Sequence, residues 1–514
     1  MKNIKAAYAL PLAAAGLSAC GGIVSYDRPN IIFIMTDDHT AQAMSCYGGT
    51  LMETPNMDIL AREGMRLDNC YATNALSGPS RACILTGKFS HMNGFKDNES
   101  VFDGNQQTFP ELLQQAGYTT GIIGKWHLMS EPQGFDHWSI LTGQHEQGDY
   151  YNPDFLENGQ PVTEEGYVTD IITDKAVEFI DSADGPFMLM CHHKAPHRNW
   201  MPAPRHLGMF NDTVFPEPAT LLDDYSGRGA AAKEQDMSIA ETLTDDWDLK
   251  LLTRDEILET TNSLRDVYTR MPVEVQHKWD SVYAPRIAEY RTLKLNGDDL
   301  VRWKYQQYMR DYLATVKSVD ESIGALLSHL EKTGKLDDTI IVYTSDQGFF
   351  LGEHGWFDKR FMYEECFRMP VLVRYPKEIR PGSTSAAICM NIDFAPTFLD
   401  YAGADIPSDI QGRSLRKVLE GKTPEDWRKA AYYHYYEYPA EHSVKRHYGI
   451  RTRDFKLMHF YHDIDEWEMY DLRNDSQEMS NIYDDPAYAS EREMMRTLLD
   501  YVQELYQDPA RSNH

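Results

Sequence analysis

The sequence predicts an α/β protein whose core is a large, mostly parallel, doubly wound sheet flanked by helices. Residues 30–35 and 339–344 form continuous apolar runs rich in β-branched side chains, which is typical of strands buried on both faces. Shorter runs of this kind alternate with stretches of helical periodicity such as residues 312–330. The shorter runs are residues 119–123, 187–191 and 371–373. This alternation indicates βαβ units, which place parallel strands in one sheet.

Acidic and amide side chains follow the two longest predicted strands directly. Asp37 and Asp38 come after the first strand, and Asp346 and Gln347 come after the second. Open α/β sheets bind ligands at the carboxyl ends of their strands, and hard oxygen ligands without paired thiols suit Ca²⁺ or Mg²⁺. Each pair alone is more typical of a helix cap or a solvated turn. Together they predict a divalent-cation site.

The rest of the chain divides into an insertion and a second, smaller domain. Residues from about 220 to 310 are charged and helix-like, which predicts an insertion near the mouth of the site. Short aromatic-rich runs after residue 425 predict an antiparallel sheet, and residues 491–505 predict a closing helix. We therefore expect a main domain over residues 30–425 and a C-terminal domain over residues 426–514.

The N-terminus has the pattern of an export signal. Two lysines and an apolar run over residues 6–16 precede Leu17-Ser-Ala-Cys20, and the run is too short to span a bilayer. The last four residues resemble a bacterial lipobox, which predicts a signal peptide over residues 1–19, lipidation of Cys20 and a tether to residue 29. The alternative is a plain secretory signal with an incidental cysteine. Both predict export, and a lipid anchor would place the protein in the periplasm or on the outer surface of a Gram-negative bacterium.

Charge and cysteine content exclude several classes of protein. The net charge of −29 argues against nucleic acid and anionic membrane surfaces as partners, so that membrane attachment is expected only through the lipid. An anionic substrate would need a local cluster of cations. Seven cysteines without a CxxC pair argue against a disulfide scaffold or a zinc site.

A short motif, Ser77-Gly-Pro-Ser-Arg81, places a hydroxyl two residues before a proline and four before an arginine. By itself this pattern is typical of a helix start, and an ordinary serine is a weak nucleophile. The motif resembles the modification site of the type I sulfatases of the alkaline phosphatase superfamily. In that family a cysteine or serine at this position is oxidised to Cα-formylglycine.

The resemblance extends from about residue 28 to residue 480. Segments that look like sulfatase signatures follow one another in family order: residues 30–38, 54–58, 77–87, 124–128 and 345–348, with Lys359, then residues 393–399 and 411–415. The fold implied is alkaline phosphatase-like, in agreement with the α/β pattern.

The resemblance implies a role for each matching residue. The divalent ion, Ca²⁺ with Mg²⁺ as the alternative, would be held by Asp37, Asp38, Asp346, Gln347 and the modified Ser77. The family usually has asparagine where this chain has Gln347, which keeps the amide oxygen but changes its reach. Arg81 and Lys125 would hold the formylglycine, and the sulfate would be bound by Lys125, His197 and Lys359.

The family mechanism uses two histidines that would otherwise be taken as structural. A hydroxyl of the hydrated formylglycine would attack sulfur to form a covalent sulfo-enzyme, while His197 protonates the departing sugar oxygen. The second hydroxyl would then lose a proton, plausibly to His127, and sulfate would leave. Unmodified Ser77 has no second hydroxyl, so we expect it to be inactive. A serine-type site resembles those matured by an anaerobic radical-based enzyme, which indicates an anaerobic bacterium.

The substrate expectation rests on residues 345–365, which resemble bacterial sulfatases that remove 6-O-sulfate from N-acetylglucosamine in heparin, heparan or mucin glycans. Candidate sugar contacts are His442, Arg446 and His447, although their aromatic surroundings fit a domain core equally well. Three alternatives stay open: a sulfatase for another glycan position, a phosphodiesterase or phosphonate hydrolase of the same superfamily, and a non-catalytic glycan-binding lipoprotein. The intact set of candidate catalytic residues argues against the last.

Overall fold

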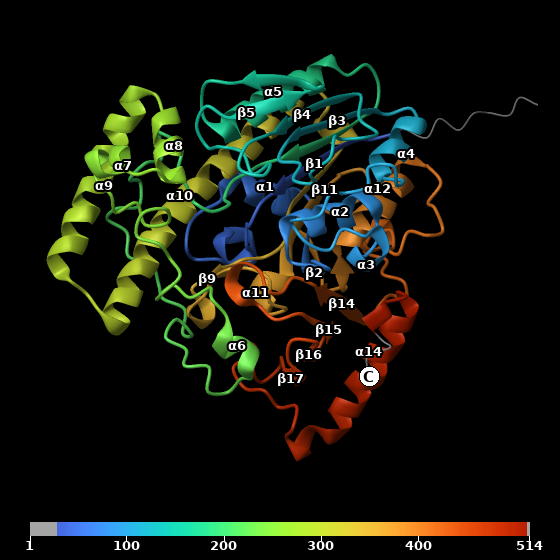
Figure 1. Ribbon diagram of the computed structural model, residues 1–514. Helices are drawn as coiled ribbons and strands as arrows, with labels where there is room; N and C mark the ends of the chain where they lie inside the picture. Colours follow the sequence, from blue (N-terminus) through green and yellow to red (C-terminus); the bar gives the residue numbers. More distant parts are fainter. Residues whose placement is uncertain (1–27, 511–514) are drawn as a thin grey trace, which may run out of the picture.

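The computed structural model describes residues 28–510 (Figure 1). The predicted signal peptide and Cys20 lie outside this range, as do residues 511–514. Within residues 28–510 no helix is both long enough and apolar enough to cross a membrane.

The central sheet has eleven strands, and its middle is parallel. Strand β1 (Asn30–Thr36) lies between β7 (Phe187–His192) and β8 (Thr339–Ser345) and is parallel to both. The parallel set continues from β7 through β3 (Thr119–Gly124) to β4 (His137–Leu141). The predicted α/β class with a mostly parallel sheet is confirmed.

Antiparallel strands extend the sheet on both sides of this parallel middle. The predicted strand at residues 371–373 belongs to β11 (Arg368–Arg374), which runs antiparallel to β8 and β2 and so is not part of a parallel βαβ unit. The remaining strands are β2 (Met65–Tyr71), β5 (Asp154–Glu157), β6 (Gln160–Thr163), β12 (Ser383–Ser385) and β13 (Cys389–Met390).

Helices cover both faces of the sheet because alternate side chains of the central strand are apolar on both sides. Ile32 and Ile34 of β1 join one core with α1 (Pro55–Glu63), α5 (Val168–Ser182) and α10 (Gly297–Lys332). The alternate residues of β1 join a second core with the helices of the other face (Figure 1). These helices are α2 (Ser77–Thr86), α4 (Phe109–Gln115) and α12 (Phe394–Ala402). The sheet is therefore doubly wound.

Most of the segment predicted as a helical insertion forms a lobe beside the sheet, and the buried side chains of this lobe join the core on that face (Figure 1). The helices of the lobe are α7 (Arg254–Glu259), α8 (Ser263–Arg270) and α9 (Val273–Leu293), whereas α6 (Ala230–Glu234) packs on the C-terminal sheet (Figure 1). Helix α10 begins in this lobe and continues along the sheet, so that one long helix joins the lobe to the main core (Figure 1).

The C-terminal region contains the predicted antiparallel sheet and closing helix. Its strands, in both chain and spatial order, are β14 (Ala430–Tyr435), β15 (His447–Thr452), β16 (Phe455–Phe460) and β17 (Glu466–Asp471), and α14 (Ala489–Leu505) contacts β15 and β16. The sheet shares a core with the segment that follows β8, because Trp356 and Phe361 pack among its aromatic residues. This shared core brings the small sheet to the edge of the main one.

Candidate active site

Two neighbouring strands deliver the predicted acidic residues to one point. Thr36 at the end of β1 is in register with Ser345 at the end of β8, so the residues that follow leave the sheet side by side. The backbone N–H of Asp38 donates to Asp346 Oδ1 at 3.3 Å. Asp38 has φ +68°, so the chain turns sharply directly after the strand. All four residues predicted at these strand ends are fully buried.

Ser77 lies next to this acidic cluster at the first position of α2. Its Oγ donates to Asp37 Oδ1 at 3.0 Å. The following Gly78 is required by close packing, because a Cβ there would approach the Phe95 ring within 2.8 Å and Asn98 Oδ1 within 2.9 Å. The motif therefore does start a helix, and the helix presents the serine to the carboxylates.

One turn further along α2, Arg81 joins the two acidic strand ends. Its Nη2 donates to Asp37 Oδ2 at 3.3 Å and to Asp346 Oδ2 at 3.1 Å. Its Nη1 donates to the carbonyl oxygen of Lys125 at 2.8 Å. The guanidinium thus connects α2 to both central strands and to the end of β3.

Two lysines complete the cationic side of the site. Lys125 follows β3 and its Nζ pairs with Asp37 Oδ2, while Lys359 Nζ lies 2.6 and 2.8 Å from the two oxygens of Asp38. Burial opposes ionisation of Asp37, but the charges of Lys125 and Arg81 outweigh it and hold its pKa well below the ordinary value. Burial and the charge of Asp37 raise the pKa of Asp38 to about 8 in spite of Lys359. The predicted cation cluster is therefore present in this otherwise acidic protein.

The oxygen atoms of the acidic cluster fit a hard divalent cation. The candidate donors are three carboxylates, the Ser77 hydroxyl and the amide of Gln347, a set without sulfur. Gln347 Nε2 donates to Asp38 Oδ1 at 2.6 Å, and its Oε1 is buried without a hydrogen-bond partner. An orphaned buried oxygen is unfavourable unless a ligand satisfies it. A cation bound among these groups would do so.

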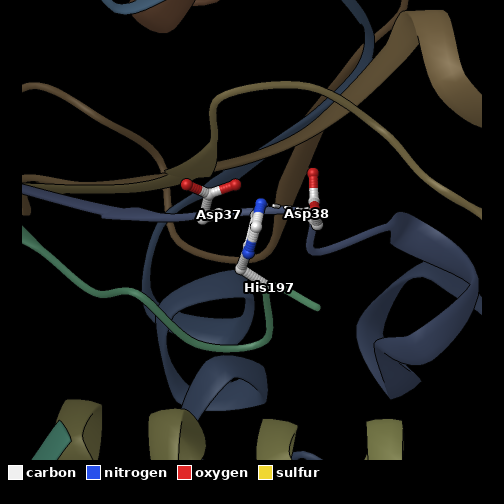
Figure 2. A group of neighbouring side chains, drawn as sticks. All are labelled: Asp37, Asp38 and His197. Atoms are coloured by element: carbon white, nitrogen blue, oxygen red, sulfur yellow. Dashed lines mark ion pairs between the residues drawn. The ribbon is translucent and has the colours of Figure 1, made fainter. Parts of the chain in front are cut away.

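His197 is one of the two predicted acid–base residues, and Figure 2 shows its ring directed at the two adjacent aspartates. Its Nε2 lies 3.8 Å from Asp38 Oδ2, and its Nδ1 lies 2.7 Å from the carbonyl oxygen of Arg198. That carbonyl can only accept, so Nδ1 carries a proton and Nε2 is the nitrogen that faces the site. The side chain keeps 18% of its surface exposed. Nε2 is therefore placed where it could exchange a proton with a bound substrate.

His127, the second predicted histidine, lies just past β3 in a left-handed backbone conformation with φ +60°. Burial and the charge of Lys125 lower its pKa well below the ordinary value, so the imidazole is neutral. Its Nε2 lies 2.8 Å from Nε2 of Gln147. No sequence pattern indicated Gln147, because it lies in an irregular loop without periodicity.

The candidate sugar contacts separate into one near the site and two elsewhere. His442 Nε2 pairs with Asp358 Oδ2 at 2.8 Å, and Arg360 Nη1 donates to Asp358 Oδ1 at 2.7 Å. Asp358 and Arg360 flank Lys359 in sequence, and Asp358 Oδ1 lies 3.9 Å from Lys359 Nζ, so Asp358, Arg360 and His442 form a polar wall beside this lysine. Sequence reasoning missed Asp358 and Arg360, although their positions on either side of Lys359 could have indicated them.

Arg446 and His447 are occupied within the small domain. Arg446 donates to the carbonyl of Tyr436 and to Asp463 Oδ1, both at 2.8 Å. His447 is fully buried, with Nδ1 at 2.8 Å from the Lys445 carbonyl and Nε2 accepting from the backbone N–H of Met362 at 3.2 Å. Neither ring nitrogen of His447 is free for a sugar, which matches the alternative that it belongs to the domain core.

The site contains a buried serine, carboxylates of the kind that bind metal ions, and a surrounding group of cations. These features define a hydrolase of anionic esters, and it is built on an alkaline phosphatase-like sheet. The family model for sulfatases matches residues 29–404, and that for the C-terminal region of N-sulphoglucosamine sulphohydrolase matches residues 352–505. The chain belongs to the sulfatase family, and it is a sulfuric ester hydrolase.

Two relatives and one solved structure show how far this family resemblance extends. N-acetylglucosamine-6-O-sulfatase of Bacteroides thetaiotaomicron is 70% identical over 99% of this chain and 92% of its own length. Human N-acetylglucosamine-6-sulfatase is 28% identical over 78% of this chain and 66% of its own. The structure of BT4656 in complex with its substrate D-glucosamine-2-N,6-O-disulfate has a TM-score of 0.93 and 72% identity, covering 94% of this chain and 99% of the other.

The phosphonate monoester hydrolase of Agrobacterium radiobacter shares the fold alone. Its TM-score is 0.68 at 20% identity, covering 93% of this chain and 94% of the other. The fold therefore does not by itself decide between sulfate and phosphonate esters.

Proposed function

We propose that this protein hydrolyses the 6-O-sulfate of N-acetylglucosamine or glucosamine residues in sulfated glycans. The observation that carries the proposal is the 70% identity, over nearly the full chain, to an N-acetylglucosamine-6-O-sulfatase. The solved structure that is 72% identical holds a 6-O-sulfated glucosamine as its substrate. Specificity within a common fold resides in the residues around the reacting group, so a relative of this identity is a better guide to the substrate than the fold alone.

The Asp358, Arg360 and His442 wall supports a sugar as the group that carries the sulfate. The side chains of Asp358 and His442 are nearly buried and lie beside Lys359. Carboxylate, guanidinium and imidazole groups at the edge of an anion site can bond the hydroxyls of a ring whose sulfate is held by the lysine. Both ring nitrogens of His442 are occupied, Nδ1 by the Asp236 carbonyl and Nε2 by Asp358, so we propose that His442 holds Asp358 in place while Asp358 and Arg360 bond the sugar.

In the proposed reaction Ser77 is first oxidised to formylglycine. As an aldehyde hydrate, residue 77 supplies one oxygen to attack sulfur in line with the sugar oxygen and a second whose deprotonation expels sulfate. Lys125 and Lys359 offset the charge of the sulfate oxygens, and Arg81 fixes the position of α2. With the anionic substrate bound, His197 takes up a second proton from solvent at Nε2 and donates that proton to the departing sugar oxygen, which is a poor leaving group as an alkoxide. His127 takes up the proton of the second hydroxyl.

The divalent cation, Ca²⁺ in this proposal with Mg²⁺ as the alternative, would be held by Asp37, Asp38, Asp346, Gln347 and residue 77. When bound it would lower the pKa of a hydroxyl at residue 77 and stabilise charge on the sulfuryl group. The buried Gln347 oxygen without a partner supports this assignment.

Export, lipid anchoring at Cys20 and maturation by an anaerobic radical-based enzyme are also part of the proposal. They are supported by the lipobox-like segment and by serine at position 77. Sulfated glycans are extracellular polymers, so an exported enzyme would meet them directly.

A panel of glucosamine and N-acetylglucosamine sulfated at the 2-N, 3-O or 6-O position, assayed for released sulfate, tests the proposal. We expect release from the 6-O esters and none from the matched phosphate esters. Ser77→Ala is the matched control and should release nothing while still binding the 6-O-sulfated sugar. Failure on the 6-O esters with release from another position would refute the substrate assignment. An active preparation whose peptide 77–81 contains only serine by mass spectrometry would refute the formylglycine mechanism.

A further inference from the structure

The loop over residues 142–149 forms hydrogen bonds that hold the turn carrying Lys125 and His127 in place. Glu146 Oε2 accepts the backbone N–H groups of Leu128 and Met129, both at 3.0 Å. Met129 has φ +58°, so the turn contains strained positions that need outside support. A buried lysine fixes this loop in turn, because Lys194 Nζ donates to the Gln147 carbonyl at 3.1 Å.

The side chain of Gln147 connects the two reactive side chains of that turn. Its Oε1 accepts from Lys125 Nζ, and its Nε2 lies 2.8 Å from His127 Nε2. A lysine ammonium can only donate, so the amide oxygen must face Lys125 and the amide N–H must face His127. His127 Nε2 is therefore the accepting nitrogen, and the ring proton lies on Nδ1.

We propose that Gln147 is a positioning residue that fixes the tautomer of His127 and the place of the Lys125 ammonium as one unit. The inference rests on the proposed function for its catalytic consequence, because the Gln147 amide must release the Nε2 lone pair before His127 can take up a proton there. Loss of the amide would leave the ring free to exchange tautomers and would release the ammonium from one of its contacts. The chemical step should then suffer more than substrate binding.

Three variants test separately the contact of Gln147 with Lys125 and its contact with His127. Gln147→Leu removes donor and acceptor and keeps the bulk. Gln147→Glu keeps an acceptor for Lys125 but offers His127 no N–H, so the ring should place its proton on Nε2 to donate to the carboxylate. Gln144→Leu is the matched control, because Gln144 lies in the same loop and its Nε2 bonds Asp149 instead.

The first readout is the ¹⁵N chemical shifts of the His127 ring in histidine-labelled protein, assigned with His127→Ala. It needs neither turnover nor modification of Ser77, so it stands even if the proposed function fails. We expect the Nδ1–H form in the wild type and in Gln144→Leu, a mixture in Gln147→Leu and the Nε2–H form in Gln147→Glu. An Nε2–H wild type, or shifts that do not respond to either Gln147 variant, would overturn the inference.

The second readout is steady-state kinetics on the 6-O-sulfated sugar with modified protein. We expect Gln147→Glu to lower kcat about 10- to 100-fold with KM changed less than about threefold, and Gln144→Leu to leave both near wild type. Equal kcat in all variants would refute the catalytic role. If the wild type releases no sulfate, the proposed function has failed and the ring shifts alone decide the role of Gln147.

Discussion

Replacing Lys359 by methionine should separate the two tasks of this lysine, pairing with Asp38 and binding the substrate. Lys359 Nζ lies 2.6 Å from Asp38 Oδ1, and both side chains are buried. At an effective dielectric constant of about 20, unit charges at this separation attract by about 6 kcal/mol. Desolvation of both groups offsets part of this attraction, and breaking a buried pair on one side typically destabilises a protein by about 3 to 5 kcal/mol.

The expected loss depends on the divalent cation, because a cation bound to Asp38 would take over part of the pairing. We expect Lys359→Met to lower the free energy of unfolding by about 3 kcal/mol or more in chelator and by clearly less with excess Ca²⁺. The assay is denaturant unfolding in both conditions at about pH 9, above the pKa of about 8 at which Asp38 ionises, so that the carboxylate carries its charge. Lys417→Met is the matched control, since Lys417 is exposed and its pair with Glu420 should contribute less than about 1 kcal/mol.

Activity provides the second measurement on this variant. With Ca²⁺ restoring stability, Lys359→Met should still lose about 100-fold or more in kcat/KM, because one of the sulfate-binding charges is absent. An unchanged unfolding free energy in chelator would contradict the ion pair. Normal kcat/KM in a folded, modified variant would remove Lys359 from the sulfate site.

Two further outcomes follow from His197 and from the pKa of Asp38. His197→Ala should lower kcat on the sugar sulfate by about 100-fold or more, yet far less on nitrophenyl sulfate, whose phenolate leaves without a proton; equal losses would rule out general-acid catalysis. Burial and the charge of Asp37 raise the pKa of Asp38 to about 8, so a cation must displace a proton below that pH. Calorimetry on protein stripped of metal should show that the affinity for Ca²⁺ rises about tenfold per pH unit from pH 6 to 8 and is constant above pH 8. An affinity that does not change with pH would contradict the assignment of Asp38 as a ligand.

Residues in continuous motifs were predictable because strands and helix starts have local signals. Asp37 and Asp346 follow apolar runs that can only be buried strands, and Ser77 opens a helix whose proline and glycine mark its first turn. Pairing direction has no such signal, so β11 was not distinguished from the parallel strands. Gln147 lies in an irregular loop, and the turn after β3 supplies its two partners, Lys125 and His127.

The sequence also could not predict which face of the small sheet each side chain occupies. Whether a residue such as His447 faces the substrate or the core depends on the register of β15 against β14 and β16, and aromatic side chains occupy both faces of that sheet. The aromatic composition was visible in the sequence, and the choice of face was not.

The register that aligns Thr36 with Ser345 has a consequence for how the chain acquires its site. Asp38 and Asp346 are 308 residues apart in sequence, so the acidic cluster is not complete until β8 has been made and has docked on β1. Contacts of such long range form slowly, because a long loop must close before they contribute. Strand β1 can therefore complete the site only after most of the chain has been made. Binding of a cation at the acidic cluster would report that β1 and β8 have paired.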